Sequence, residues 1–224
     1  MDPLTILMAL TTSVDPSTIY IDGDLTKDDV VTINFVKEFP DGRADRTTPG
    51  DYSVEFLDEG GAVLSSTPLR ASFANQVVHE FMPDGSTRNR EIANSVLTIS
   101  LLLAYPLETS SIRFKHGGRV LFEFDPVSQT LTDLIRRIPD RQFDKNPQQR
   151  RQALLSKAAA FEKMLSHEKD TAALRKLVAD IRRAFEEWLV EIVPVSPERS
   201  KEERLAAIDR IRIRVEARLD SPPE

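Results

Sequence analysis

The feature that most constrains the fold of this chain is a change of hydrophobic period at Asp125-Pro126. Before this point, apolar residues occur in short runs that often alternate with polar ones, which is typical of half-buried strands. After it they recur about every 3.6 residues, which is typical of amphipathic helices. All eight glycines lie between Gly23 and Gly118. We therefore predict a segregated α+β chain, with a β domain over residues 15–127 and a helical domain over residues 128–219.

The first part is predicted to be an antiparallel β-sandwich. Its apolar runs are rich in β-branched and aromatic residues, and turn sequences such as Pro40-Asp41-Gly42 separate them at short intervals. About seven strands with this spacing predict an immunoglobulin-like or fibronectin-like sandwich. The polar stretch 75–94 carries a Pro-Asp-Gly turn and is predicted to be a long hairpin or a mobile loop. The predicted strands are Ile19–Ile21, Val30–Val36, Tyr52–Leu57, Ala62–Ser65, Val96–Leu103, Ser111–Phe114 and Arg119–Phe124.

The second part is predicted to be a bundle of three helices. Asn146 and Pro147 are typical of a helix start, and Asp170 is placed to cap a second helix. Ser200 with Glu203 forms a capping box for a third helix. Each helix has a single apolar face, so the three must pack together or against the sandwich.

The junction between the two parts is short. A further small helix is expected over Thr130–Ile138, and the connecting segment contains a proline but no glycine. We therefore expect the two halves to form one rigid unit, with Ile135 and Ile138 in the apolar contact between them.

Composition excludes several classes of function. There is no cysteine, which removes disulfides, thiolate catalysis and thiolate metal sites. Residues 1–127 carry 10 Lys and Arg against 19 Asp and Glu, whereas the rest of the chain carries 20 against 17, and so acidic a first half argues against nucleic acid as a partner. No apolar run approaches the roughly 18–20 residues that span a bilayer. Leu4–Leu10 lacks a basic region before it, so we do not interpret it as a signal peptide.

One acidic cluster is a candidate metal site. Asp22, Asp24, Asp28 and Asp29 lie within eight residues, and carboxylates at this density can bind Ca²⁺ through hard oxygen ligands. Their spacing is not that of an EF-hand loop, and a solvated hairpin turn would account for the same residues. Calcium is the one cofactor that the sequence suggests.

Catalytic machinery is not visible in the sequence. His79, His116 and His167 are far apart and form no zinc-binding motif, and we interpret all three as structural. No serine lies in a nucleophile elbow, and there is no phosphate-binding loop. We therefore predict that the chain is not an enzyme.

Two other features have a functional and a structural interpretation. Trp188 could be a sugar-stacking platform, but Phe185 and Leu189 place it on the buried stripe of its helix, so core packing is preferred. Basic pairs such as Arg182-Arg183 could bind phosphates, but acidic residues are interleaved with them, which favours a salt-bridged solvent face.

Both halves resemble known modules of exported proteins. Gly50–Asp58, together with Ser111–Phe114, is similar to the accessory immunoglobulin-like β-domains of secreted prokaryotic metalloproteases and surface proteins. Ile138-Pro139-Asp140 with Asp180-Ile181 and Trp188-Leu189 resembles the FIMAH-like helical modules of exported prokaryotic proteins, although Glu168-Lys169-Asp170 stands where those modules have a glycine-bearing turn. The resemblance implies a multi-domain exported parent and no catalytic residues.

These observations predict a non-catalytic accessory module of an exported or cell-surface protein, used for spacing, anchoring or protein–protein contact. Its expected location is therefore extracellular, and its expected partner is a protein or another domain of the parent. The alternative is a carbohydrate- or calcium-dependent adhesin domain.

Overall fold

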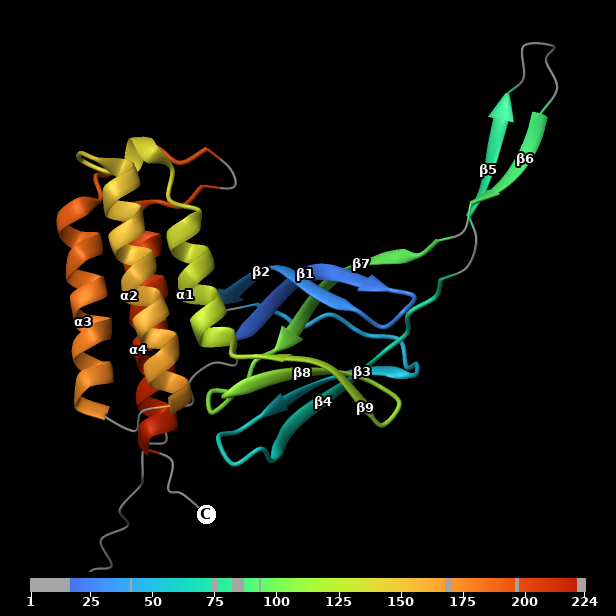
Figure 1. Ribbon diagram of the computed structural model, residues 1–224, viewed down its shortest axis with the longest axis horizontal. Helices are drawn as coiled ribbons and strands as arrows, with labels where there is room; N and C mark the ends of the chain where they lie inside the picture. Colours follow the sequence, from blue (N-terminus) through green and yellow to red (C-terminus); the bar gives the residue numbers. More distant parts are fainter. Residues whose placement is uncertain are drawn as a thin grey trace, which may run out of the picture.

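The computed structural model describes residues 17–220 except 41, 74–75, 82–86, 93, 168–170 and 196–197. In the described part, nine strands precede four α-helices and one short 3-10 helix, which confirms the segregated α+β class (Figure 1). The strands are β1 (Thr18–Thr26), β2 (Val31–Phe39), β3 (Tyr52–Leu57), β4 (Val63–Leu69), β5 (Gln76–Phe81), β6 (Thr87–Ile92), β7 (Val96–Ala104), β8 (Ser111–His116) and β9 (Arg119–Phe124). The helices are α1 (Pro126–Arg136), η1 (Asp140–Gln142), α2 (Pro147–His167), α3 (Thr171–Trp188) and α4 (Lys201–Asp220).

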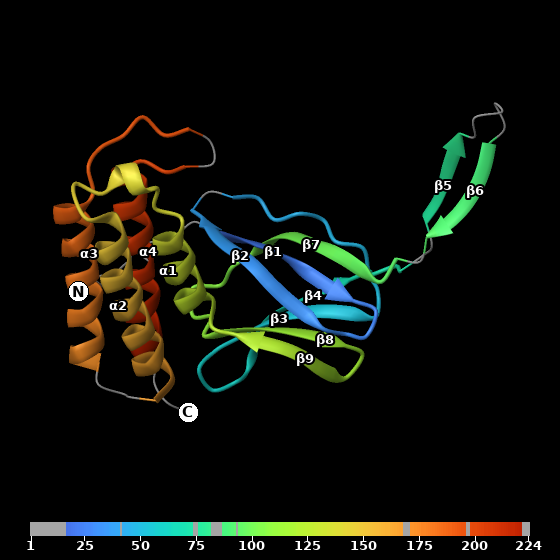
Figure 2. The same cartoon turned by 45° about the horizontal axis from the view of Figure 1, so that its top comes forward.

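Seven of the strands form two antiparallel sheets, in the orders β2-β1-β7 and β4-β3-β8-β9. The sheets lie face to face as two layers (Figure 2). In β1 the buried Ile19, Ile21 and Leu25 alternate with partly exposed residues, because successive side chains of a strand point to opposite faces. The inward-facing residues of both sheets form one apolar core that includes Val54 and Phe56. The predicted sandwich of about seven strands is therefore confirmed.

The remaining two strands form a separate hairpin. β5 and β6 pair in register from Gln76 with Ile92 to Phe81 with Thr87, and they form a two-stranded sheet of their own. This hairpin projects beyond the end of the sandwich that faces away from the helices (Figure 1). The prediction of a long hairpin in 75–94 is confirmed over these two strands.

The helical part is a bundle of four α-helices and not of three, because the further small helix expected at the junction packs into the bundle as α1. The additional helix, α1, begins at Pro126 rather than at Thr130, because the Asp125 side chain caps it by accepting hydrogen bonds from the backbone N–H groups of Val127 and Ser128. Its apolar face enters the same buried core as the other three helices, with Leu131 almost fully buried.

The predicted capping box at the start of α4 is present. The Glu203 backbone N–H donates to Ser200 Oγ at 3.1 Å, and the Ser200 backbone N–H donates to Glu203 Oε2 at 2.7 Å. The core of the four helices gathers one stripe from each, including Leu154, Phe161 and Ile208.

Arg204 of α4 lies inside the bundle, where its side chain caps the C-terminal end of α1. Its guanidinium donates to Gln142 Oε1 at 2.7 Å and to the backbone oxygens of Leu134 and Arg137 at 3.0 and 2.9 Å. These two carbonyl groups belong to the last turn of α1, where a cation is favourable. Burial lowers the pKa of Arg204 to about 10, so the side chain remains charged at neutral pH.

The bundle is joined to one end of the sandwich by Arg214, which reaches out from α4. Its guanidinium donates to Glu38 Oε1 at 2.8 Å, and the two side chains are only 3% and 8% exposed. It also donates to the backbone oxygen of Pro106 at 2.8 Å and lies 3.3 Å from the centre of the Tyr105 ring. A buried arginine with this many partners fixes the direction of α4 relative to the sandwich.

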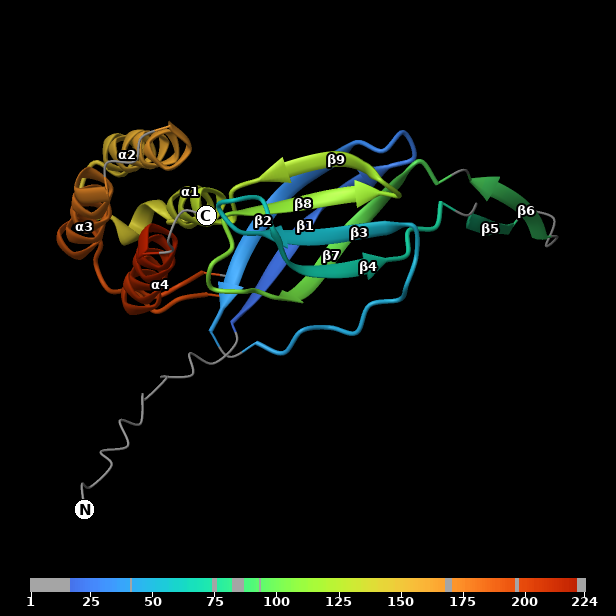
Figure 3. The same cartoon turned by 90° about the horizontal axis from the view of Figure 1, so that it is seen from below.

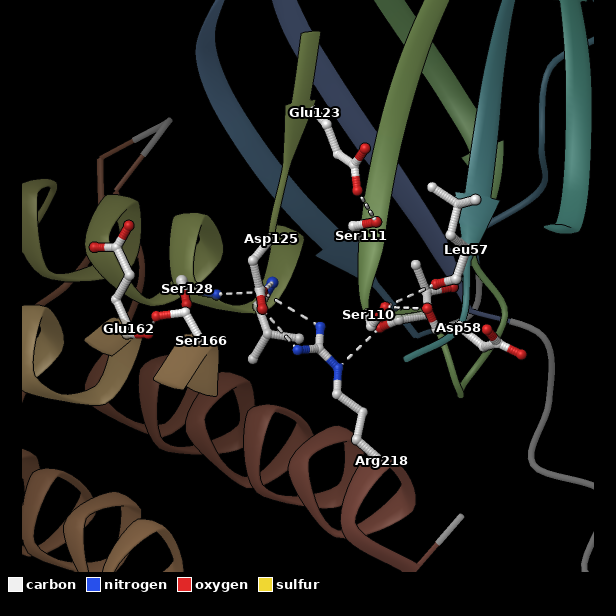
Figure 4. Close-up of polar contacts among 12 residues, drawn as sticks. Leu57, Asp58, Ser110, Ser111, Glu123, Asp125, Ser128, Glu162, Ser166 and Arg218 are labelled. Carbon is white, nitrogen blue, oxygen red and sulfur yellow. Dashed lines mark hydrogen bonds and ion pairs between the residues drawn. The ribbon is translucent and has the colours of Figure 1, made fainter. Parts of the chain in front are cut away.

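Two further buried contacts complete this junction. Arg218, one turn beyond Arg214, donates to Asp125 Oδ2 at 2.7 Å and to the backbone oxygen of Thr109 at 3.0 Å (Figure 4). On α1, Asp133 Oδ2 accepts from the backbone N–H of Val36 in β2 at 3.0 Å, and burial raises the pKa of this carboxyl group.

Ile135 and Ile138, which we expected between the halves, instead belong to the buried core of the helices. The contacts between the helices and the sandwich are therefore polar. Side chains of α1 and α4 make them with the ends of strands and with the loops beside them. The helices and the sandwich each keep an apolar core of their own.

Candidate functional site

The end of the sandwich opposite the helices, here called the distal end, gathers the candidate functional residues. It contains the β1–β2 turn, the β8–β9 turn and the starts of β3 and β7, and the β5–β6 hairpin projects from the same end (Figure 1). The opposite end is the one that contacts α1 and α4.

A polar group that we call the Asp29 cluster ties the two sheets together at the distal end. Tyr52 Oη donates to Asp29 Oδ1 at 2.8 Å, and His116 Nδ1 lies 3.0 Å from Asp29 Oδ2. The Arg119 guanidinium contacts the same carboxylate. The rings of Tyr52 and His116 are stacked, with their centres 4.1 Å apart. Three side chains from the four-stranded sheet therefore converge on the Asp29 carboxylate of the other sheet, which is only 13% exposed.

The β1–β2 turn presents Asp29 to the other sheet. Asp29 has a φ of 63°, a left-handed conformation that aspartate tolerates better than most residues. The turn is closed by the hydrogen bond from the Asp29 backbone N–H to the Thr26 backbone oxygen, 3.0 Å long, and by Val30 N–H donating to Thr26 Oγ1 at 3.1 Å. The geometry of the turn thus directs the carboxylate toward its partners on β3, β8 and β9.

The protonation states of the cluster follow from these contacts. Hydrogen bonds from His116 and then from Tyr52 hold the pKa of Asp29 below its ordinary value. Burial and the bond to Asp29 raise the pKa of Tyr52 to about 12. At neutral pH, Asp29 is therefore a charged acceptor and Tyr52 is a neutral donor, an arrangement that holds the two turns in place.

The structure distributes the four predicted calcium ligands over a strand and a turn. Asp22 and Asp24 lie on β1, where Asp24 Oδ2 accepts from Asn34 Nδ2 at 3.0 Å. Asp28 is exposed in the turn, and Asp29 is engaged in the cluster. Among the described residues, no group of three or more His, Asp or Glu side chains is arranged to hold a metal ion. The calcium site remains a prediction.

His116 is a residue whose role the sequence did not reveal. We interpreted it as a turn residue, but the register pairs it with Tyr52 across β3 and β8, and with Arg119 across β8 and β9. Asp29 is 87 positions away in the chain, so no local pattern could have joined the two. The side chains of His79 and His167 lie outside the described part.

Three exposed valines, here called the valine rim, lie at the distal end of the sandwich, as the Asp29 cluster does. Val30, Val96 and Val120 are 55%, 46% and 48% exposed. Val30 follows Asp29 and Val120 follows Arg119 in the chain, while Val96 stands opposite Thr26 in the register of β1 with β7. A singly exposed valine needs no explanation, but three at one end of the sandwich give that end apolar surface that a partner could cover.

An apolar cleft of about 440 Å³ opens beside the cluster, between the two sheets. Leu25 and Val31, on either side of the β1–β2 turn, line it together with Tyr52 of the cluster. Its other apolar walls are Leu69, Ala71, Leu97, Ile99, Leu101, Leu102, Phe114 and Leu121.

Comparison of the chain with protein-family models, with curated proteins and with solved structures found no match. Within the described ranges, none of the helices is both long enough and apolar enough to cross a membrane.

Proposed function

We propose that this chain is a non-catalytic interaction module of an exported or cell-surface protein, which contacts a protein partner through the distal end of its sandwich. The observation that carries the proposal is the difference between the two ends. One end is held against the helices by buried arginine contacts, whereas the other presents the valine rim and the projecting hairpin.

The buried contacts between the helices and the sandwich support a role in holding the distal end toward a partner. A module that acts as a spacer or an anchor must hold its contact surface in a fixed direction, and the Arg214–Glu38 pair provides a specific geometry for this. The four-helix part then forms the base, and the sandwich points the distal end away from it (Figure 1).

The projecting β5–β6 hairpin supports direct contact with a protein partner. A two-stranded hairpin on its own is only marginally stable in water, so β5 and β6 have the most to gain from pairing with a partner. Addition of a partner strand to an exposed hairpin edge is a common mode of protein recognition. Val96, which begins β7 just after the hairpin, would supply apolar area next to such a strand.

The proposal includes the fold family of each half, an immunoglobulin-like or fibronectin-like sandwich and a FIMAH-like helical module. An immunoglobulin-like or fibronectin-like sandwich is supported by the chain crossing between the two sheets from β2 to β3 and from β7 to β8. The resemblance of the helical part to FIMAH-like modules supports an exported parent.

Site-specific photo-crosslinking tests the proposed contact surface. A photoreactive residue at Val120, or at Val96, is expected to give a discrete adduct in cells that make the protein. Val63 is the matched control. It is 53% exposed and belongs to the same four-stranded sheet as Val120, but it lies at the opposite end of that sheet. Equal adducts from Val63 and Val120, or none from either rim position, would contradict the proposal.

A further inference from the structure

The cleft between the sheets is covered on one side by residues 45–50, here called the strap. The Asp45 backbone N–H donates to the Leu102 backbone oxygen of β7 at 2.8 Å. At the other end, a Cβ atom on Gly50 would lie 2.5 Å from the backbone oxygen of Leu69 in β4. The strap therefore crosses from an edge strand of one sheet to an edge strand of the other, along the side of the sandwich that Figure 3 shows.

The cleft beneath the strap has the character of a small-molecule site. Its volume of about 440 Å³ lies in the usual range for such sites, and its walls are mostly apolar. Leu97, Ile99 and Leu101 line it from alternate positions of β7 and are only partly buried, although Ile99 and Leu101 pack against the core. The sheets thus leave apolar surface uncovered at this point, which an apolar ligand would cover.

The rim of the cleft is positively charged. Arg46 of the strap and Arg70 at the end of β4 both line the cleft and are both exposed. Among the described residues that line the cleft, Asp45 is the only carboxylate. Two guanidinium groups beside an apolar cavity favour a ligand whose anionic head stays at the surface while its chain is buried.

We propose that this cleft binds a single-chain anionic amphiphile, with the alkyl chain between the sheets and the acidic head on Arg46 and Arg70. An extended peptide fits less well, because the strap already occupies the edge of β7 by its hydrogen bond to Leu102. Each methylene that enters the cleft raises the affinity by about three- to fourfold. This activity is separate from partner binding at the valine rim.

Calorimetric titration of the full chain with dodecanoate, below its micelle concentration, tests the proposal. Dodecanoate is expected to bind at one site, whereas hexanoate and dodecyltrimethylammonium bind at least tenfold more weakly. A parallel titration with a lysophosphatidylglycerol of the same chain length shows whether the source of the chain is a free fatty acid or a lysolipid, and binding of either supports the proposal.

Two variants locate the site. The double substitution Arg46→Gln with Arg70→Gln is expected to weaken dodecanoate binding at least tenfold. Arg43→Gln, exposed just before the strap and outside the lining, is expected to leave it unchanged. Ala71→Trp fills the mouth of the cleft and is expected to abolish binding without unfolding the chain, which a melting curve verifies. Equal affinity for the anionic and cationic amphiphiles, or unchanged binding in both variants, overturns the proposal. Neither result would alter the crosslinking from Val120.

Discussion

Removal of the Arg214 guanidinium should uncouple the helices from the sandwich. Arg214→Met keeps most of the apolar stem but leaves Glu38 buried without its cation, and removes the donors to the backbone oxygens of Pro106 and Tyr105. Loss of one partner from a buried ion pair costs about 3–5 kcal/mol. We expect Arg214→Met to lower the free energy of unfolding by an amount in that range.

A double-mutant cycle with Glu38→Gln isolates the energy of the Arg214–Glu38 pair from the other contacts of Arg214. Glu38→Gln removes the negative charge but keeps an oxygen that can accept from Arg214. The double variant should be less destabilised than the sum of the two single variants, by about 1.5–3 kcal/mol, because the unpaired buried charge is then absent. Arg212→Met is the control on the same helix. Its side chain is exposed and its ion pair with Glu216 is long, so we expect a change below about 0.5 kcal/mol.

Urea unfolding with two probes measures both quantities. Trp188 is the only tryptophan and reports on the helices, while the tyrosine signal reports on the sandwich, because all three tyrosines lie in that part of the chain. The unaltered chain should show one coincident transition, and Arg214→Met should show two. Coincident transitions in Arg214→Met, with a loss below about 1 kcal/mol and additive effects in the double variant, would refute the reasoning.

Other predictions concern the distal end and the bundle. Asp29 has a lowered pKa in the folded chain, so it contributes stability above its ordinary value of 3.8 that is lost as the pH falls through the folded value. The melting-temperature difference between the unaltered chain and Asp29→Asn should thus be large at pH 7 and shrink below about pH 4; a constant difference contradicts this. Trp188→Ala should cost about 2–3 kcal/mol by denaturant titration, less than a fully buried tryptophan, because Trp188 only packs against the edge of the core beneath Arg150. A cost near zero would instead favour an exposed sugar-stacking role. Millimolar Ca²⁺ should leave the melting temperature unchanged because Asp29 already has three partners, whereas a rise of several degrees would support the calcium-dependent alternative.

Local signals in the sequence predicted the elements of the fold well. The capping box at Ser200 and the alternation in β1 depend on residues within a few positions of each other, so the chain displays them directly. The length of α1 was underestimated, because its cap, Asp125, directly follows the last strand and was interpreted as part of a linker.

The sites were harder to predict, because their residues meet only in the folded chain. Arg212 and Arg214 look alike in the sequence, yet one is exposed and the other is buried against Glu38, which is 176 positions away. Asp29 and His116 likewise meet only through the pairing of β3 with β8 and the packing of the sheets. Charge is visible in a sequence, whereas burial and long-range partners are properties of the fold.

The central claim is that the helices hold the sandwich, and therefore its distal end, in one fixed direction. The chain has no cysteine, so two introduced cysteines at Ser66 on β4 and Ala159 on α2, both exposed, would carry the only spin labels. Distance measurement by pulsed electron paramagnetic resonance should give one narrow distribution, unchanged by 0.5 M salt because the junction pairs are buried, and broadened by Arg214→Met. A broad or two-peaked distribution in the otherwise unaltered chain would contradict the claim.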